Sequence, residues 1–301
     1  MTPRRYTNAT GFKHALEQRL RATAPSGVAF ARRRQLLVFD RFLARVAQVF
    51  EDSVTLKGGL VLELRLNRAR TTRDVDLRFV GPPVEVLHRL KDAGHLDLGD
   101  FMRFQVRADS THPEIQNDGM KYDGLRFRSE CELAGRIYGA PFGVDMAFGD
   151  PITGEPDVVV TEDVLGFAGI TPPTLRLYPV ETHLAEKLHA YTLPRARPNT
   201  RIKDFPDLAL LAMTREIDAV RLKAAFEQTF SFRGTHSLPY FVPEPPETWH
   251  QPYAKMARED ALPWLTLDAL TTAVRAFLGP VLASAHAGTW VPETWTWSMP
   301  R

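Results

Sequence analysis

Apolar residues recur at helical spacing in the first part of the chain. They do so from Phe12 to Leu20 and again from Arg33 to Val49, with an Ala-Pro-Ser-Gly break at 24–27 between the two stretches. Spacings of three and four residues place such side chains on one face of a helix. The pattern therefore predicts an N-terminal helical segment, residues 1–50, whose apolar faces pack on the body of the protein.

Shorter apolar runs, bounded by glycine and proline, follow in the middle of the chain and are typical of β-strands. The expected strands cover residues 53–56, 74–80, 101–108, 125–133 and 142–148. Residues 60–67 are rich in Leu, Glu and Arg and poor in β-branched side chains, which favours a short helix instead. A second helix is expected over residues 84–93.

From Val180 onward the apolar spacing is helical again. The expected helices cover residues 180–193, 205–213, 218–229 and 266–278, and the proline-rich stretch 237–253 is expected to be irregular. This order of elements predicts an α+β fold with two lobes, an N-terminal lobe of mixed β-sheet and helices and a mainly helical C-terminal lobe. We place the first lobe at residues 51–170 and the second at residues 171–301.

Composition narrows the class of protein. Hydrophobic residues make up 44% of the chain and charged residues 25%, the balance of an ordinary soluble globular protein. The formal charge of +2 does not indicate a nucleic-acid binder, and a single cysteine, Cys131, excludes an intramolecular disulfide framework. No apolar run reaches the roughly 18–20 residues of a membrane span, and the N-terminus lacks a secretory signal. We therefore expect a cytoplasmic protein.

Three aspartates form the first candidate site. Successive side chains of a strand point to opposite faces, so Asp74 and Asp76 project on the same side. Two neighbouring carboxylates raise each other's pKa unless a cation lies between them. Asp145 lies in another expected strand, which could bring a third carboxylate to the pair and form the ligand set of two-metal phosphoryl transfer with Mg²⁺. A solvated strand face would explain the first two aspartates alone.

A Gly-Gly pair upstream favours the metal-site interpretation. Gly58 and Gly59 allow close approach of the backbone, and the helix expected after them presents unpaired N–H groups to a phosphate. Lys57 belongs to the same predicted nucleotide-binding element. Arg70 and Arg73, shortly before the aspartate pair, are candidates for contact with a triphosphate.

The second lobe carries a candidate lysine. In the helix expected at residues 180–193, Lys187 borders the apolar stripe, whereas Glu186 points nearly opposite to it at 100° per residue. Lys187 could reach a phosphate in the cleft between the lobes. It could equally cover apolar surface with its stem and keep its ammonium in water.

The segment before the next helix, "RIKDFPDLALL", has two interpretations. Asp204 suits an N-cap position and Asp207 lies three residues later, so helix capping would explain both acids, while either could instead face the cleft. Arg201 and Lys203 belong to a basic loop that could clamp a triphosphate or an RNA backbone, or could be solvated.

Taken together, these motifs resemble the nucleotidyltransferases of the DNA polymerase β-like superfamily and, more narrowly, the AbiEii toxin family that includes the mycobacterial MenT toxins. The resemblance is carried by "LKGGLVLELRLNRARTTRDVDLRF", "HLAEKLHAY" and "RIKDFPDLALL". It extends from about residue 10 to the end of the chain. It implies that the first lobe is the nucleotidyltransferase core.

The resemblance also implies roles for individual residues. The implied metal ligands are Asp74, Asp76 and Asp145, and the implied catalytic set adds Lys187 and Asp204. The residues assigned to nucleotide binding are Lys57, Gly58, Gly59, Arg70, Arg73, Arg201, Lys203 and Asp207. Gly59 stands where many superfamily members have serine, so a hydroxyl contact to phosphate is missing there.

As a function, the resemblance implies a Mg²⁺-dependent toxin of a toxin–antitoxin system. It would bind two Mg²⁺ ions, take an NTP as substrate, and transfer NMP to the 3′ acceptor end of tRNA with release of pyrophosphate. Its partners would be tRNA and a cognate antitoxin that acts as a transcriptional repressor, and it would have no membrane partner. Two alternatives stay open: transfer to a hydroxyl of a protein or small molecule, and nucleotide binding by a regulator without turnover.

Overall fold

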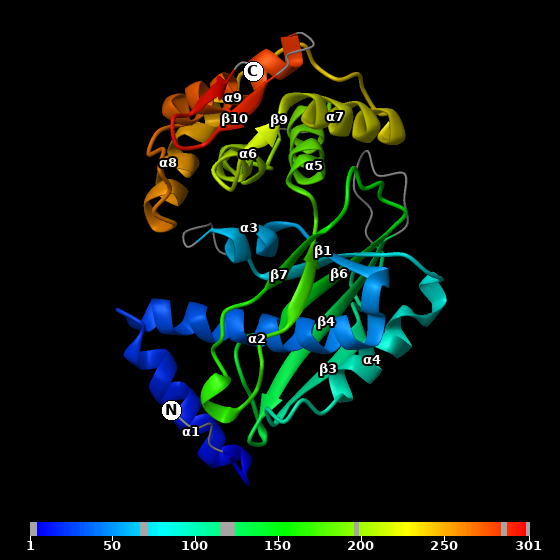
Figure 1. The fold of residues 1–301 in the computed structure, drawn as a ribbon, viewed down its shortest axis with the longest axis vertical. Helices are drawn as coiled ribbons and strands as arrows, with labels where there is room; N and C mark the ends of the chain where they lie inside the picture. The colour runs from blue at the N-terminus through cyan, green and yellow to red at the C-terminus, as the bar shows by residue number, and fades with distance from the viewer. Residues whose placement is uncertain (1–4, 67–71, 115–123, 196–198, 284–287, 299–301) are drawn as a thin grey trace.

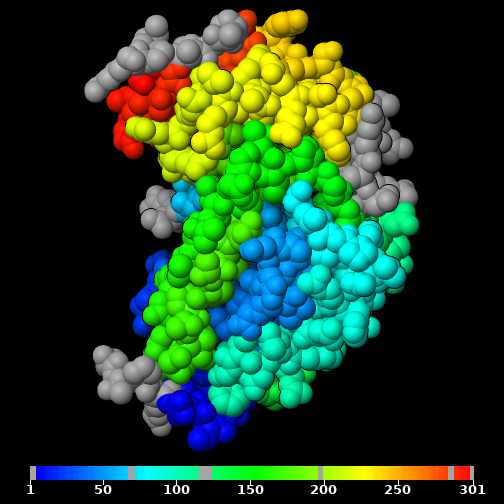
Figure 2. Space-filling model, turned by 45° about the vertical axis from the view of Figure 1, so that its right-hand side comes forward, coloured from blue at the N-terminus to red at the C-terminus, as the bar shows by residue number. Residues whose placement is uncertain are grey.

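The computed structural model describes residues 5–66, 72–114, 124–195, 199–283 and 288–298. Two bodies lie along the long axis of the molecule, as Figure 1 shows: a large β-sheet with the N-terminal helices at one end, and the helices from α5 onward at the other. In Figure 2 the green part of the chain runs along the surface from the first body into the second. Arg70 lies outside the described residues.

The two N-terminal helices are confirmed. They are α1, Ala9–Ala22, and α2, Gly27–Phe50. The side-chain oxygen of Ser26 accepts a hydrogen bond from the Ala29 backbone N–H at 3.1 Å and caps the start of α2, which is why the break predicted at 24–27 ends where it does. In Figure 1, α2 lies across the strands of the sheet.

The large sheet is mixed. Its strands are β1 Val54–Lys57, β2 Asp74–Phe79, β3 Met102–Ala108, β4 Gly124–Leu133, β5 Arg136–Ile137, β6 Phe142–Phe148, β7 Asp157–Val160 and β8 Thr174–Leu177. Their order is β3-β4-β6-β2-β1-β8-β7, with β5 paired to β4. The pairs β2–β6 and β1–β8 are parallel and the others antiparallel. With helices α3, Gly59–Arg65, and α4, Val86–His95, this lobe confirms the α+β fold.

The alternation of β2 separates a core face from a site face. Val75, Leu77 and Phe79 are buried in the hydrophobic core of this lobe together with apolar side chains of α1 and α2. The aspartates at 74 and 76 alternate with these residues and therefore project from the opposite face. The strand thus fixes both carboxylates on one side because its other side is committed to the core.

The C-terminal lobe has its own hydrophobic core. Its helices are α5 Val180–Thr192, α6 Asp204–Ala212, α7 Ala219–Arg233, α8 His250–Glu259 and α9 Leu267–Ala283. Leu62 of α3 is part of this second core, and Figure 1 shows α3 between the sheet and the C-terminal lobe. In the described residues, no helix combines the length and the apolarity that crossing a membrane requires.

Several elements differ from the sequence-based expectation. Helix α8 begins at His250, inside the stretch expected to be irregular; its Pro252 lies in the first turn, where no intrahelical N–H bond is lost. Strands β7 and β8, each four residues long, were not expected. The C-terminal lobe also holds a small sheet of β9 Ile217–Asp218, β10 Thr289–Val291 and β11 Thr296–Ser298.

The domain boundaries at residues 50 and 170 stay a prediction. Strand β8, Thr174–Leu177, pairs within the large sheet, and Leu175 and Leu177 belong to the core of the first lobe. The C-terminal tail is held by tryptophan indoles: Nε1 of Trp290 donates to the Ala212 carbonyl at 2.9 Å and Nε1 of Trp297 to the Phe277 carbonyl at 2.9 Å.

Candidate active site

The three aspartates of the sequence motifs lie on two neighbouring strands. Strands β2 and β6 pair in parallel, with Asp76 opposite Asp145 and Asp74 opposite Gly143. Residues paired in register project from the same face, and neighbouring strands lie about 4.8 Å apart. The fold therefore brings the three carboxylates to one face of the sheet, as the strand pattern predicted. Their role as metal ligands remains a prediction.

Pairing across four strands extends this arrangement into a row of charges. Lys57 of β1 is opposite Asp76 of β2, which is opposite Asp145 of β6, which is opposite Arg126 of β4. The order of charges along the row is positive, negative, negative, positive. The two acids at its centre lie side by side, and a basic residue flanks each of them.

Glycines leave the space that the carboxylates occupy. A Cβ atom added at Gly58 would lie 1.9 Å from Oδ2 of Asp76, and Gly58 has a φ of +71°, in the left-handed region. A Cβ added at Gly143 would lie 2.5 Å from Oδ1 of Asp74, which also accepts the Gly143 N–H at 3.3 Å. Gly58 thus accommodates an aspartate, and Gly59 opens the seven-residue helix α3. Gly143 was not predicted, because only the β2–β6 register reveals it.

The ionisation of Asp76 reflects these neighbours. Burial, and next the carboxylate of Asp145, raise the pKa of Asp76 to about 6, while the ammonium groups of Lys57 and Lys187 lower it. Desolvation and like charge both disfavour the ionised form. A bound cation would relieve both penalties, which is the electrostatic property expected of a metal-binding carboxylate.

Asp145 is engaged by an arginine that the sequence did not single out. Nε of Arg126 donates to Oδ1 of Asp145 at 2.7 Å and Nη2 donates to Oδ2 at 2.6 Å. Over the residues the structure describes, no three His, Cys, Asp or Glu side chains are gathered so that they could hold a metal ion. Carboxylate oxygens suit a hard divalent cation such as Mg²⁺. The donor set therefore fits the ion in its chemistry, provided that Asp145 first releases Arg126.

Lys57 connects the sheet to the C-terminal lobe. Its Nζ is 2.9 Å from Oε1 of Glu186 on α5 and also donates to Asp150. Arg233 of α7 lies 3.3 Å from the same Glu186 oxygen. Glu186, opposite the apolar stripe in the helical count, does not face solvent, because α5 is buried around most of its circumference. The assignment of Lys57 to nucleotide binding stays a prediction.

Lys187 meets the acids of the next helix. Its Nζ lies 2.7 Å from Oδ1 of Asp204 and 2.8 Å from Oδ2 of Asp207, and Arg201 also pairs with Asp204. Capping does not explain these acids: Asp204 is the first residue of α6 rather than its N-cap, and Lys203 at the N-cap makes no side-chain capping bond. Both acids are buried and paired with Lys187. The ammonium of Lys187 also contributes to lowering the pKa of Asp76.

Two further residues assigned to nucleotide binding are exposed. Arg73 directly precedes Asp74 at the start of β2, and Lys203 directly precedes α6. Their roles remain predictions. Arg126, Gly143 and Glu186 are the site-face residues that sequence reasoning left unassigned, since their positions depend on strand register and on lobe packing.

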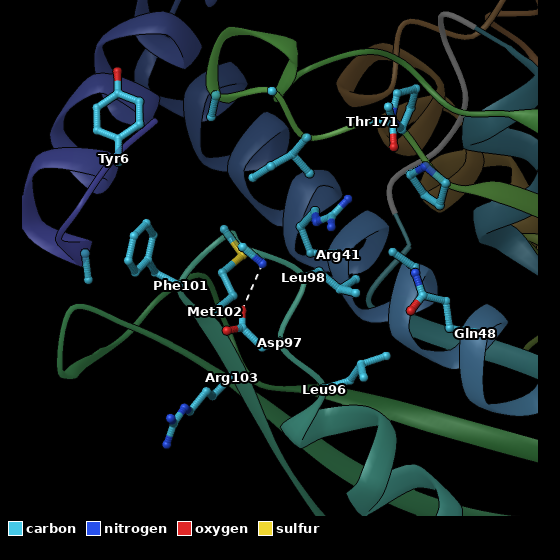
Figure 3. A pocket seen from close by; sticks show the side chains of 18 of the residues that line it. Tyr6, Arg41, Gln48, Leu96, Asp97, Leu98, Phe101, Met102, Arg103 and Thr171 are labelled. Carbon is cyan, nitrogen blue, oxygen red and sulfur yellow. Dashed lines mark hydrogen bonds between the residues drawn. The ribbon is translucent and has the colours of Figure 1, made fainter. Parts of the chain in front are cut away.

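A separate cavity of about 1110 Å³ lies under α2, away from these residues. Figure 3 shows Arg41 and Gln48 of α2 in its wall together with Phe101 and Met102. No predicted site residue lines it. Its Arg41 is already paired, with Nε at 2.7 Å from Oδ2 of Asp100. The candidate active site is therefore the face that carries the aspartates.

The chain is similar to known proteins in family and in fold. The family described as "Nucleotidyl transferase AbiEii toxin, Type IV TA system" matches residues 41–287. Among solved structures, MenT4, the nucleotidyltransferase toxin Rv2826c from Mycobacterium tuberculosis H37Rv, is similar over 94% of this chain and 92% of its own, with a TM-score of 0.62 and 17% identity. JHP933 from Helicobacter pylori is similar over 66% of this chain and 80% of its own, with a TM-score of 0.39 and 16% identity.

No curated protein sequence matches the chain. The similarity to MenT4, at 17% identity, concerns the fold. The family assignment rests on the match over residues 41–287, which spans most of the chain and contains all of the predicted site residues. The chain belongs to the AbiEii family of nucleotidyltransferase toxins of toxin–antitoxin systems.

Proposed function

We propose that the protein is a Mg²⁺-dependent toxin that transfers NMP from an NTP to the 3′ acceptor end of tRNA and releases pyrophosphate. Family membership supports the transferase chemistry and the toxin class. The acceptor, the metal dependence and the roles of single residues are part of the proposal.

The observation that carries the proposal is the in-register pair of Asp76 and Asp145, with Lys57 opposite Asp76 on the next strand. A carboxylate pair on a solvated strand would not need neighbouring glycines to leave space for its oxygens. Here a Cβ at either Gly58 or Gly143 would collide with one of the acids. Glycine costs backbone conformational entropy on folding, and here it leaves space for carboxylates. Such an arrangement suits the binding of a cation.

In this proposal Asp74, Asp76 and Asp145 hold Mg²⁺. Mg²⁺ held by these residues would supply positive charge to neutralise the triphosphate and to activate the acceptor hydroxyl. Asp145 also accepts the proton of that hydroxyl. Lys187 steadies the triphosphate, and its partners Asp204 and Asp207 hold its ammonium at 2.7 and 2.8 Å.

The remaining nucleotide-binding assignments follow the same geometry. Lys57 is oriented by Glu186 at 2.9 Å and lies in register with Asp76, so it stabilises negative charge at the row of acids. Arg73 and Lys203 are exposed and provide phosphate contacts at the rim. Arg201 acts through its pair with Asp204. The antitoxin is proposed to be a cognate repressor, and the site of action the cytoplasm.

The test is transfer of label to RNA. Purified protein is incubated with Mg²⁺, each α-labelled NTP and total tRNA, and Asp76→Asn is compared with the wild type. Asp76→Asn should transfer label at least about a thousandfold more slowly than the wild type, because the substitution removes a carboxylate charge from the centre of the site. Asp52→Asn, which alters a carboxylate that is 88% exposed and pairs with Arg176 at 2.9 Å, is the matched control.

The acceptor is tested in the same assay. Periodate oxidation of the tRNA removes its terminal diol and should abolish transfer, while RNase should release the label. Label that survives RNase and stays on protein would contradict the RNA acceptor. Nucleotide binding by calorimetry with no pyrophosphate release, together with equal growth arrest by wild type and Asp76→Asn, would contradict the transferase mechanism altogether.

A further inference from the structure

Arg126 has a contact that the proposed chemistry leaves unexplained. Its guanidinium covers both oxygens of Asp145, at 2.7 and 2.6 Å, in a two-bond fork. Paired hydrogen bonds of this kind are the strong form of the arginine–carboxylate contact. Asp145 is also the third carboxylate expected to hold Mg²⁺. The fork occupies one lone pair on each oxygen, and the positive guanidinium repels a second cation at the same carboxylate, so Arg126 and Mg²⁺ compete for Asp145.

The backbone fixes this contact, but the guanidinium is able to leave it. Arg126 and Asp145 are directly opposite one another on the antiparallel strands β4 and β6, so their Cα positions are set by the sheet. The side chain of Arg126 is 34% exposed, whereas that of Asp145 is 16% exposed. Rotation about the side-chain bonds of Arg126 would move its charged end toward solvent without disturbing the strands.

The other basic groups of the site are differently placed. Lys57 donates to Glu186 and Asp150, and Lys187 contacts Asp204 and Asp207, so both are tied to acids outside the aspartate triad. Arg126 instead pairs with the triad itself. Binding of a divalent cation at Asp145 therefore displaces Arg126 in particular.

We propose that Arg126 is an exchangeable counter-ion: it occupies Asp145 in the free protein, leaves when the divalent cation binds, and then pairs with a phosphate of the bound triphosphate. This inference rests on the proposed function. The planar fork that fits a carboxylate also fits a phosphate, and arginine stays charged throughout. The same residue would thus keep the third acid neutralised in the empty site and compensate phosphate charge in the loaded one.

Arg128 provides a matched control on the same strand. It lies two residues from Arg126, projects from the same face, and pairs through Nε with Oδ2 of Asp109 at 2.9 Å. Arg128→Gln removes one positive charge from the same strand without freeing Asp145, because Arg128 pairs with Asp109. A difference between Arg126→Gln and Arg128→Gln therefore reports the direct contact with the metal ligand.

The first experiment measures Mn²⁺ alone. The signal of the free hydrated ion in electron paramagnetic resonance gives its affinity for the wild type, Arg126→Gln and Arg128→Gln without nucleotide. Arg126→Gln should bind Mn²⁺ about five- to tenfold more tightly, because the ion no longer competes with a partly buried ion pair. Arg128→Gln should stay within about twofold of the wild type.

The second experiment adds inorganic tripolyphosphate to the Mn²⁺-loaded proteins, which probes phosphate contacts without a base. Arg126→Gln should bind it about tenfold more weakly. The two expected shifts have opposite signs, which a purely structural role of Arg126 would not produce. Arg126→Lys keeps the charge and loses the fork, so it should fall between wild type and Arg126→Gln in both measurements, and thermal unfolding verifies that each variant is folded.

Unchanged or weaker Mn²⁺ binding by Arg126→Gln would overturn the inference, as would equal effects of Arg126→Gln and Arg128→Gln. So would tripolyphosphate binding that does not depend on Arg126. Neither measurement uses an acceptor or turnover. If the opposite shifts occur but no NMP transfer to RNA is found, the exchange stands and the proposed function fails; if transfer occurs without the shifts, only the exchange fails.

Discussion

The N-terminal lobe contains two clusters of opposite charges, and they differ in how well their charges are matched. Under α2, Asp100 is fully buried and accepts from Nε of Arg41 at 2.7 Å, from Nη1 of Arg45 at 2.9 Å and from Nη2 of Arg45 at 2.6 Å. On the site face, Asp76 and Asp145 lie side by side. The first cluster surrounds one acid with bases, whereas the second places two acids side by side, with one basic residue next to each.

The pKa values follow this difference. Burial opposes ionisation at Asp100, but the hydrogen bonds and charges of Arg45 and Arg41 outweigh it and lower the pKa. At Asp76, burial and Asp145 act in the same direction and raise the pKa to about 6. A cluster that satisfies its own charges stabilises the fold, while one that leaves a charge poorly satisfied is suited to a ligand. The following predictions test whether the two clusters divide stability and function in this way.

The largest effect is expected at Asp100. Asp100→Ala leaves the guanidinium groups of Arg41 and Arg45 buried without their carboxylate and should lower the free energy of unfolding by about 3–5 kcal/mol. Urea unfolding measures this loss, and transferase activity of the protein that remains folded should be kept. Asp97→Ala, in the same loop, removes one exposed bond to the Gly99 N–H at 2.8 Å and serves as control. A loss below about 1 kcal/mol at Asp100 would contradict the structural role of the cluster.

A smaller effect is expected at Gly58. An added Cβ would lie 1.9 Å from Oδ2 of Asp76, and the backbone has a φ of +71°. Gly58→Ala should cost about 1–3 kcal/mol of stability and displace Asp76, which should also lower activity. Gly99 has the same φ of +71° with nothing within 4 Å of an added Cβ, so Gly99→Ala isolates the backbone cost. Equal stability and equal activity of the two variants would show that Gly58 does not keep room for Asp76.

The comparison also shows what the sequence could reveal about the site. Asp74 and Asp76 were predictable because two-residue alternation is a local property of a strand, and the buried Val75 and Leu77 fixed which face the acids take. Asp145 was predictable as a strand acid for the same reason. Its neighbour Arg126 was not, since the register between β4 and β6 is set by the assembled sheet.

Helix α5 illustrates the opposite outcome. Counting 100° per residue placed Lys187 at the border of the apolar stripe and Glu186 nearly opposite to that stripe, where a solvated face is expected. The count assumes one apolar face and one solvated face. In α5 both faces are covered, by the C-terminal helices on one side and by the sheet lobe on the other, so Glu186 meets Lys57 at 2.9 Å. Lobe packing, which no local pattern encodes, decided the position of this charged side chain.

The smallest effect is a dependence on pH that should have opposite signs in the two clusters. The pKa of Asp76 is raised from 3.8 to about 6 in the folded protein, so ionisation of Asp76 destabilises the fold. This loss of stability is absent below the unfolded pKa of 3.8 and complete above about pH 6. Asp76→Asn lacks this cost. Its gain in stability over the wild type should therefore grow between about pH 4 and pH 7, reaching about 1–2 kcal/mol in EDTA.

Asp100 should behave in the reverse manner. Its pKa is lowered in the folded protein, so the ionised carboxylate stabilises the fold at pH values above the unfolded pKa of 3.8. That stabilisation is lost as the pH falls through the folded-state pKa. The deficit of Asp100→Ala should thus be largest near neutral pH. Mg²⁺ should reduce the advantage of Asp76→Asn, because the ion relieves the repulsion between the wild-type carboxylates, and should leave Asp100→Ala unaffected. A pH-independent difference for Asp76→Asn, or equal responses of both variants to Mg²⁺, would remove the distinction between a charge cluster that serves the fold and one that serves the site.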